Sequence, residues 1–338
     1  MGKVNNVFTN YFRNRTRFSD LYNGICFQGK SVVLPELLTD ASEVYNEADA
    51  EKTEHTSGYT QVKRGKRRER IRDIKMRLAT GEMLCFFAQE NQNLVDYTMP
   101  YRCMQYDTME YGRQLNQLRR KNRENKNWDS WAEEACGIKK TDRLTPIYTL
   151  CVYHGLEKWD GPRNLRDMMD FGKDTEGISS LFHDYPMRLC CLNEMEDFQV
   201  FHTEIRQVFQ IMQFRKDKKK LQELINTDMT YRHMDADTLE VISVMLNAPK
   251  IWENREKHMC EDGEREDYDM CQALKEWIED ERDAGMQDGI EKGIEKGIEA
   301  LIEICKELSL SREETSKKVE EKFELKMPVE VYLTRYWK

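Results

Sequence analysis

The chain has 338 residues, of which 39% are hydrophobic and 34% are charged, and its formal net charge is −9. This length and apolar content suffice for a substantial core, divided over one large and one smaller domain or two ordinary domains, and the high charged fraction favours a helical protein with much solvated surface. No apolar run approaches the roughly 20 residues of a membrane span, and the N-terminus lacks the apolar core of a signal peptide, so we expect a cytoplasmic protein without membrane contact.

The motifs that are absent exclude several classes of site. The ten cysteines lie scattered, mostly inside apolar runs, and we interpret them as small core residues. No CxxC pair, no HExxH and no other zinc-type Cys/His spacing occurs. The phosphate-binding loops GxGxxG and GxxxxGK[ST] are missing, as are serine-hydrolase and kinase signatures. We therefore expect neither a structural zinc ion nor a nucleotide cofactor.

The N-terminal third combines a helical entry, a polar loop and a basic run. Apolar residues in 5–27 recur at spacings of three and four, which predicts an amphipathic helical entry, and the polar stretch 39–65 reads as a long loop. Residues 61–77 hold nine Lys or Arg against two acids, a net charge of +7. Such a run is typical of a site for DNA phosphates, although a solvated loop is the alternative interpretation. The bases proposed to contact DNA are Lys63, Arg64, Lys66, Arg67, Arg68, Arg70 and Arg72.

The middle of the chain has the pattern of an α/β fold. Residues 71–78 alternate in polarity, 79–82 resemble a turn, and 83–92 read as a fully buried strand, so a hairpin is predicted. The elements expected after it are a helix at about 99–121, strands at 145–153 and 187–192, and helices within 201–214 and 235–246. This order of helices and strands indicates an α/β architecture.

The second strand of the hairpin ends in polar residues. Side chains two apart on a strand share a face, so Glu90 and Gln92 point together, and Asp73 on the paired strand can converge on Glu90. The two carboxylates, with the Asn91 carbonyl between them, can hold a Mg²⁺ ion that keeps several waters. Such an ion would lower the pKa of a bound water and neutralise charge on a scissile phosphate. The alternative is that these polar residues merely end a buried strand.

The segment around these residues carries a family resemblance. Residues 68–115, RERIRDIKMRLATGEMLCFFAQENQNLVDYTMPYRCMQYDTMEYGRQL, resemble the core of the recombination-promoting nuclease (Rpn) family, also called YhgA-like putative transposases of the PD-(D/E)XK nuclease family. Asp73 falls at the family's motif aspartate, and residues 90–92 at a Glu-x-Gln that replaces Glu-x-Lys. Arg102 and Tyr106 match an Arg-xxx-Tyr on the following helix. The similarity extends to 17–38, to 145–169 and to the C-terminal glycine repeat, and so covers nearly the whole chain.

The resemblance implies a fold, an activity and a site. The fold would be a restriction-endonuclease-like (PD-(D/E)XK) mixed-sheet core at 1–194, followed by a helical extension at 195–254 and an acidic helical tail at 255–338. The activity would be that of a Mg²⁺- or Mn²⁺-dependent DNA endonuclease associated with recombination or mobile elements. The implied catalytic residues are Asp73, Glu90, Gln92, Arg102 and Tyr106, and the implied metal ligands are Asp73, Glu90, Asn91 and, on the first helix, Asp20. Many relatives have an Asp and a Phe-Lys pair where this chain has Asn6 and Phe8-Thr9-Asn10.

Gln92 is the main departure from the nuclease motif. A lysine here would polarise the attacking water, whereas a neutral amide can only orient it by hydrogen bonds. Arg102 could supply the missing cation, because a planar guanidinium suits phosphate oxygens; it could equally form a salt bridge with Glu90 or Asp107. The alternative function is a catalytically weak or inactive nuclease-fold protein that acts as a DNA-binding or oligomeric interaction module.

The tail differs from the rest of the chain in charge and in pattern. Residues 252–299 carry seventeen acids against seven bases, and glycine recurs at every fourth position from Gly285 to Gly297. Each glycine costs a solvated helix about 1 kcal/mol relative to alanine, so the repeat indicates either a close helix contact, as in a homo-oligomer formed through the tail, or a loose spacer. Ser311 and Glu314 form a capping-box pattern for a later helix. His154 and Trp159 are expected to pack or cap a turn.

Overall fold

The computed structural model describes residues 3–41, 44–47, 68–71, 73–80, 84–172, 177–260 and 267–337. The chain divides into two compact units, Met1–Met270 and Cys271–Lys338. Both boundaries expected from the sequence, at 194 and 254, fall within the first unit.

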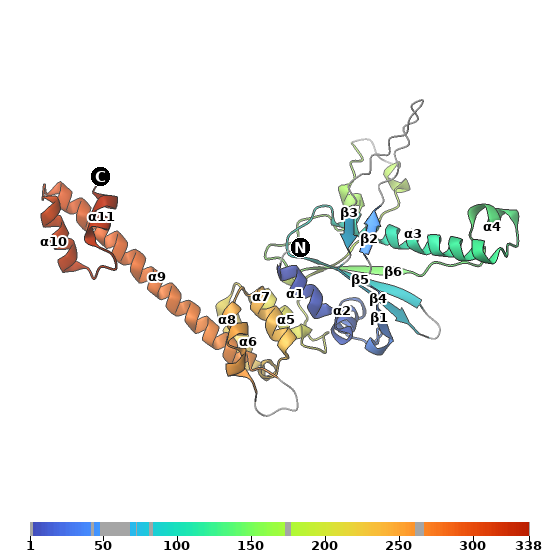
Figure 1. The fold of residues 1–338 in the computed structure, drawn as a ribbon, viewed down its shortest axis with the longest axis horizontal. Coiled ribbons are helices and arrows are strands. Elements are labelled where there is room, and N and C mark those ends of the chain that lie inside the picture. The colour runs from blue at the N-terminus through green and yellow to red at the C-terminus, as the bar shows by residue number, and fades with distance from the viewer. Residues whose placement is uncertain are drawn as a thin grey trace. The chain divides into compact units, whose positions relative to one another are not determined.

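The first unit is an α/β structure (Figure 1). Its strands are β1 (Leu38–Asp40), β2 (Val44–Glu47), β3 (Arg68–Ile71), β4 (Ile74–Ala79), β5 (Leu84–Gln92), β6 (Ile147–Tyr153) and β7 (Arg188–Cys191). Its helices are α1 (Lys3–Phe12), α2 (Arg15–Phe27), α3 (Met99–Asn125), α4 (Trp131–Cys136), α5 (Ile205–Phe214), α6 (Lys218–Thr227), α7 (Ala236–Met245) and α8 (Pro249–Glu253). The predicted hairpin, the later strands and the long helix are thus confirmed.

Among the described residues, five strands form a mixed sheet in the order β1-β4-β5-β6-β7. β4 is antiparallel to both β1 and β5, whereas β5, β6 and β7 run parallel to one another. A parallel pair needs a crossover connection, and α3 lies in the connection from β5 to β6. The expected α/β class is therefore correct.

The prediction of a continuous loop over 39–65 was wrong for the residues that the structure describes there. Leu38–Asp40 pairs with β4, and Val44–Glu47 pairs with β3 in a separate two-stranded sheet. The sequence did not predict these strands because their side chains are polar. Their backbone hydrogen bonds are made with strands that lie far along the chain, so no local pattern marks them.

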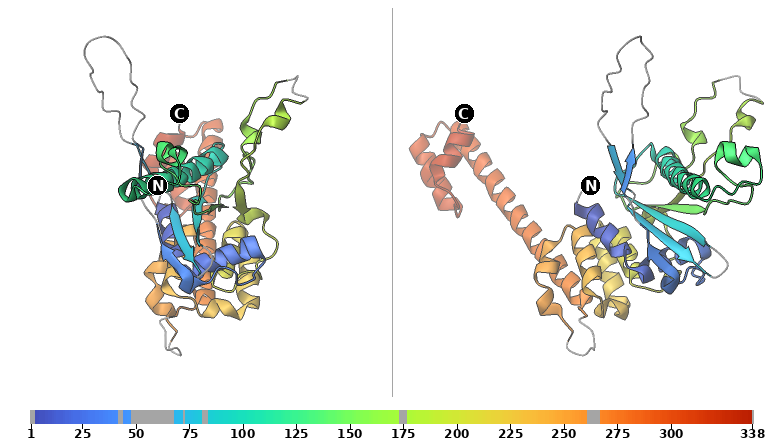
Figure 2. Two further views of the ribbon diagram at one scale, coloured as in Figure 1. Left: turned by 90° about the vertical axis from the view of Figure 1, so that its right-hand side faces the viewer. Right: turned by 45° about the vertical axis from the view of Figure 1, so that its right-hand side comes forward.

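Each face of the sheet is covered by different helices (Figure 2). On one face, α1 and α2 pack on apolar side chains; the Tyr22 and Phe87 rings lie 4.6 Å apart, and the Tyr22 hydroxyl donates to the carbonyls of Ala88 and Tyr148 at 2.5 and 2.9 Å. The opposite face lies under α3 and carries alternate residues of β4 and β5, including Lys75 and Glu90. Because side chains alternate between the two faces of a strand, the ionisable residues Lys75 and Glu90 both lie on the α3 face.

The helical entry consists of two helices rather than one. Asn14 separates them, and its side-chain oxygen accepts hydrogen bonds from the backbone N–H groups of Thr16 and Arg17 at 3.0 and 3.3 Å. This capping supplies partners to N–H groups that have none within the helix. It starts α2 and sets the position of the buried Arg17 and Asp20 on that helix.

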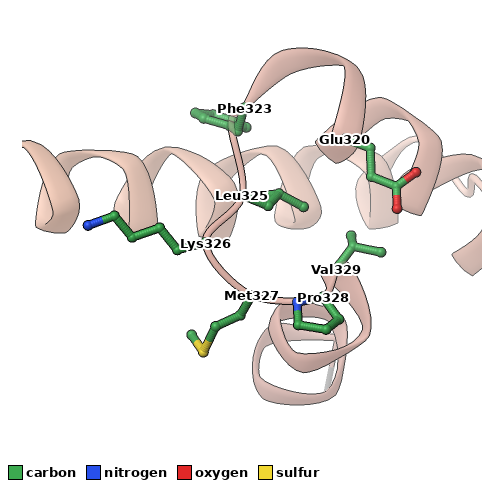
Figure 3. A pocket seen from close by; sticks show the side chains of 7 residues that line it. All are labelled: Glu320, Phe323, Leu325, Lys326, Met327, Pro328 and Val329. Carbon is green, nitrogen blue, oxygen red and sulfur yellow. The ribbon is translucent and has the colours of Figure 1, made fainter.

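The second unit contains α9 (Met270–Glu307), which begins at the last residue of the first unit, with α10 (Arg312–Lys322) and α11 (Val329–Tyr336). Ile298 and Ile302 of α9 pack with Val319 and Leu333 in its core. The predicted capping box is confirmed, because Ser311 and Glu314 cap the start of α10 reciprocally. The loop between α10 and α11 lines an open pocket (Figure 3), whose residues are Glu320, Phe323, Leu325, Lys326, Met327, Pro328 and Val329.

The glycine repeat in α9 has two different environments. A Cβ atom at Gly297 would lie 2.9 Å from the Phe323 ring, so this glycine permits a close approach. A Cβ atom at Gly285, Gly289 or Gly293 would meet nothing within 4 Å. Close packing thus explains one of the four glycines.

Most of the cysteines are core residues, as the sequence indicated. All ten cysteines are free, and seven of them are buried. In the described ranges, no helix is both long enough and apolar enough to cross a membrane.

Candidate functional site

Asp73 and Glu90 lie at the same end of the β4–β5 hairpin. Ile74 pairs with Gln89, so the register continued by one residue sets Asp73 opposite Glu90 on the α3 face. The backbone N–H of Asn91 donates to Asp73 Oδ2 at 2.7 Å, and both carboxyl side chains are buried. The structure therefore brings together the two acids that the sequence analysis paired.

The environment of Asp73 disfavours its charge. Burial raises the pKa of the Asp73 carboxyl above its ordinary value. The Asn91 N–H and the positive charge of Arg102 oppose that shift but do not cancel it. A buried carboxylate with few compensating charges is a favourable place for a cation.

Two residues of α3 complete a set that we call the Asp73 cluster: Asp73, Glu90, Arg102 and Tyr106. A guanidinium nitrogen of Arg102 lies 3.8 Å from Glu90 Oε2. Burial, followed by the charge of Glu90, raises the pKa of the Tyr106 hydroxyl, which also hydrogen-bonds to Arg102. Four of the five predicted catalytic residues thus meet between the sheet and α3.

Arg102 has a partner that the sequence analysis did not foresee. Its Nη1 donates to Asp96 Oδ2 at 2.6 Å. Burial alone would lower the pKa of Arg102, but the hydrogen bonds with Asp96 and Tyr106 raise it, so the guanidinium stays charged. Of the two expected salt bridges, the one to Glu90 is present. Asp107 instead accepts hydrogen bonds from the hydroxyls of Thr149 and Tyr185 at 2.7 and 2.5 Å.

Gln92, the fifth predicted catalytic residue, ends β5 and is half-buried. Strand alternation places it on the same face as Glu90. Its backbone carbonyl accepts a hydrogen bond from the N–H of His154 at 2.9 Å, which ties the end of β5 to the residue after β6. Gln92 therefore borders the cluster.

The Asn91 side chain points to the other face of the sheet. Its Nδ2 donates to Thr9 Oγ1 of α1 at 3.1 Å, and its Oδ1 accepts from Gln89 Nε2 at 2.6 Å. With the side chain held in this way, the main-chain carbonyl is the atom of Asn91 that remains for the predicted role as a metal ligand.

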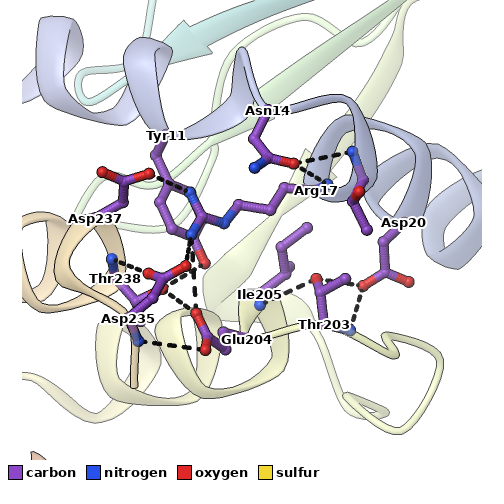
Figure 4. A network of polar contacts seen from close by, with 11 residues as sticks. Tyr11, Asn14, Arg17, Asp20, Thr203, Glu204, Ile205, Asp235, Asp237 and Thr238 are labelled. Carbon is purple, nitrogen blue, oxygen red and sulfur yellow. Dashed lines mark hydrogen bonds and ion pairs between the residues drawn. The ribbon is translucent and has the colours of Figure 1, made fainter. Parts of the chain in front are cut away.

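Asp20 does not join the cluster. Its carboxylate accepts hydrogen bonds from the backbone N–H of His202 at 3.0 Å, and from the backbone N–H and the hydroxyl of Thr203 at 2.8 and 2.6 Å. Figure 4 shows that it faces the segment leading into α5. Within the described part of the chain, no group of three His, Cys, Asp or Glu residues could hold a metal ion. Asp20 is thus engaged in joining α2 to α5.

The predicted DNA-contacting bases cannot be placed. Lys63, Arg64, Lys66, Arg67 and Arg72 lie outside the described residues, and of Arg68 and Arg70 only the backbone is described, as part of β3.

A buried ion pair beside the cluster went unrecognised in the sequence. Lys75 Nζ lies 3.0 Å from Glu110 Oε2 of α3, and both side chains have no exposed surface. Arg113 and Gln114 also donate to Glu110, at 2.7 and 3.0 Å. Although burial acts in the opposite direction, these donors lower the pKa of Glu110 to about 2. The alternation of polarity did place Lys75 on the same strand face as Asp73. It did not show that a helix covers this face and buries the Lys75 side chain.

His154 and Trp159 are packed, as expected. Trp159 is buried in a cluster with Tyr153 and Met99, and its ring nitrogen donates to the Gly161 carbonyl at 2.9 Å. Burial lowers the pKa of His154 to about 3, so this side chain is neutral.

Comparison with known families gives a match. A family model described as "Putative transposase, YhgA-like" matches residues 67–239, which is just over half of the chain. The matched range contains all four members of the Asp73 cluster. No curated protein and no solved structure matches the chain.

Proposed function

The chain belongs to the family of YhgA-like putative transposases, and on this basis we propose that it is a divalent-metal-dependent DNA endonuclease that hydrolyses phosphodiester bonds in recombination or mobile-element biology. The observation that supports this proposal best is the Asp73 cluster, in which two buried acids from paired strands face an arginine and a tyrosine of one helix. The mixed sheet agrees with the restriction-endonuclease-like fold that the resemblance implies.

The residues present fit a hard divalent cation. Asp73 and Glu90 offer carboxylate oxygens and Asn91 a carbonyl, a small set that suits Mg²⁺ or Mn²⁺ with several waters retained. Burial raises the pKa of Asp73, and a cation would offset the desolvation that causes this shift. When bound, such an ion supplies charge neutralisation at the phosphate and a more acidic water.

The chain's own residues would bind and orient the substrate. The Asn91 N–H fixes the direction of the Asp73 carboxylate. Arg102 is held by Asp96 and would present its planar guanidinium to a phosphate oxygen, where bidentate contacts are favoured. Gln92 would orient the attacking water through its amide. The basic run at 61–77 would contact further phosphates of the DNA.

A catalytically weak, DNA-binding protein is the second candidate, and one observation favours it. The Arg102 guanidinium lies 3.8 Å from Glu90 and so offsets its charge without a metal. With Gln92 in the position of the usual lysine, the site would then bind phosphate without cleaving it. In this alternative the glycine repeat of α9 would serve self-association.

Plasmid cleavage tests the proposed function. Supercoiled plasmid would be incubated with the full chain in Mg²⁺, Mn²⁺, Ca²⁺ or EDTA. We expect nicking or linearisation in Mg²⁺ or Mn²⁺, none in EDTA, and none by Asp73→Ala. The matched control is Glu124→Ala, which removes an exposed acid of α3 whose ion pair is with Arg120 and should cleave as the wild type does. Cleavage in EDTA, or by Asp73→Ala at the wild-type rate, would refute the metal-nuclease assignment.

A further inference from the structure

Large side chains are exposed in the segment that joins β5 to α3. Leu94 is 73% exposed, Tyr97 58% and Tyr101 44%. Tyr97 lies two residues before α3, and Tyr101 lies in its first turn. Side chains that are exposed to this extent are available for contact with a partner.

This segment is held by hydrogen bonds and by packing. The Tyr97 hydroxyl donates to the Asp160 carboxylate, whose oxygens lie at 3.0 and 3.1 Å. Asp96 accepts from the backbone N–H and the hydroxyl of Thr98 at 2.8 and 2.6 Å. Val95 packs against the buried cluster that contains Trp159. The Tyr97 ring is therefore held in position while exposed, so little of its conformational entropy remains to be lost on binding.

The segment borders the Asp73 cluster. It begins directly after Gln92 and leads to Arg102. Arg102 connects the two, because one of its nitrogens lies 2.6 Å from Asp96 in the segment and another lies 3.8 Å from Glu90 in the cluster. A phosphate bound at Arg102 would thus leave an adjacent nucleotide close to the exposed rings.

We propose that Tyr97 and Tyr101 form a stacking platform for an unpaired base next to the phosphate that is cleaved, so that the substrate class is DNA with unstacked bases, such as single strands, overhangs or bulges. This inference rests on the proposed function. Aromatic rings beside a cationic groove are the usual means of holding unpaired bases, because every base has a face that can stack.

The charged groups at this rim are compatible with a nucleic-acid partner. The two carboxylates are already paired, Asp96 with Arg102 and Thr98, and Asp160 with Tyr97. Arg102 stays charged while it is paired with Asp96, and 28% of its side chain is exposed. The exposed Lys158 lies two residues before Asp160, so two cations beside the rings can attract phosphates. Stacking on the rings would then add to phosphate binding.

Binding of fluorescent DNA in EDTA tests the platform without cleavage. The probes would be a blunt duplex and the same duplex with a short internal run of unpaired bases, one of which is 2-aminopurine. We expect tighter binding of the unpaired probe and quenching of its 2-aminopurine by stacking. Tyr97→Leu should weaken binding of this probe about tenfold and abolish quenching, with little change for the blunt duplex. Tyr97→Phe keeps the ring and should retain quenching.

The control is Trp131→Leu, which removes an 81% exposed ring from α4 and should leave both affinities unchanged. The platform is refuted if wild type binds the two probes equally, if Tyr97→Leu weakens both alike, or if Trp131→Leu has the same effect. Thermal melting of each variant would verify that it is folded. If the protein cleaves plasmid but binds both probes equally, only the stacking platform is refuted. If it prefers the probe with unpaired bases but does not cleave plasmid, only the nuclease activity is refuted.

Discussion

The backbone N–H of Asn91 donates a 2.7 Å hydrogen bond to the carboxylate of Asp73, although the two residues stand eighteen positions apart in the chain. The bond joins the residue before β4 to the end of β5 and fixes the direction of the carboxylate. Asp73 is thus oriented by the middle residue of the Glu-Asn-Gln triplet, so the two parts of the predicted motif form one structural unit.

Replacing each of the two acids by its amide should show whether function depends on the negative charge or only on the shape and hydrogen bonds of the side chain. Asp73→Asn retains an acceptor for the Asn91 N–H but loses the negative charge, and Glu90→Gln does the same for the second acid. We expect both variants to lose metal-dependent cleavage and to bind DNA as well as wild type or more tightly, because a negative charge near the phosphate is removed. Cleavage assays and Mg²⁺ titration calorimetry would measure this. Wild-type cleavage by the Asp73→Ala/Glu90→Ala double variant would contradict it.

Gln92→Lys tests whether the amide only orients water. Gln92 is half-buried at the end of β5 on the face of Glu90, so a lysine there could reach the cluster and supply the cation of the Glu-x-Lys motif that the resemblance implies. We expect cleavage to persist or to rise, measured as the initial rate on plasmid. Loss of cleavage together with a lower melting temperature would instead show that the amide holds the strand end in place.

The buried Lys75–Glu110 pair should stabilise the fold, and its effect should depend on the other donors to Glu110 as well as on the attraction between the two charges. Lys75→Met removes one donor from the fully buried Glu110, and we expect a loss of about 3–5 kcal/mol, since an uncompensated buried charge is costly. The double variant Lys75→Met/Glu110→Met should lose less than Lys75→Met alone. Urea unfolding of both variants would measure the difference. Equal losses would mean that Arg113 and Gln114 suffice for Glu110.

The pH dependence of Glu110 follows from its pKa. The donors around it lower that pKa from the ordinary 4.5 to about 2, so its stabilising effect is present above pH 4.5 and is lost as the pH falls toward 2.

Glu204 should have the opposite effect on stability as the pH changes. Burial, with a further contribution from Asp235, raises its pKa from 4.5 to about 7 against the effects of Thr238 and Arg17 (Figure 4). The folded state therefore holds a proton that the unfolded state releases, and the stability from this group is lost as the pH rises from 4.5 through 7. Glu204→Gln should flatten this dependence in melting curves at several pH values, because Arg17 keeps its ion pairs with Asp235 and Asp237. An unchanged slope would show that other groups determine it.

The glycine repeat can be tested by alanine substitution. A Cβ atom at Gly285, Gly289 or Gly293 meets nothing within 4 Å, so within a single chain each alanine should stabilise α9 by up to about 1 kcal/mol. Gly297→Ala should destabilise the second unit, because its Cβ would lie 2.9 Å from the Phe323 ring. Thermal melting would measure both effects. Light scattering of the triple variant adds a second test: if the tail associates through this face, alanine should reduce the oligomer.

The sequence by itself determined the α/β class, the hairpin, the long helix and the place of Asp73 and Glu90 at one end of that hairpin. These depend on local periodicity: alternation over 71–78 gave β4, and a continuous apolar run gave β5. The pairing of Asp73 with Glu90 also follows from the hairpin, because an antiparallel register is fixed by a short connection. The capping box at Ser311 could also be predicted from the sequence, because all of its atoms lie within one helical turn.

Only the tertiary structure decided what those side chains contact. Lys75 and Arg77 alternate with apolar residues in the same way, yet α3 buries Lys75 completely and leaves Arg77 exposed. The resemblance implied Asp20 as a metal ligand, but its carboxylate accepts hydrogen bonds from His202 and Thr203, which lie 182 and 183 residues further along the chain. Such contacts join segments far apart in sequence, and they depend on how helices cover the sheet, which no local pattern of residues encodes.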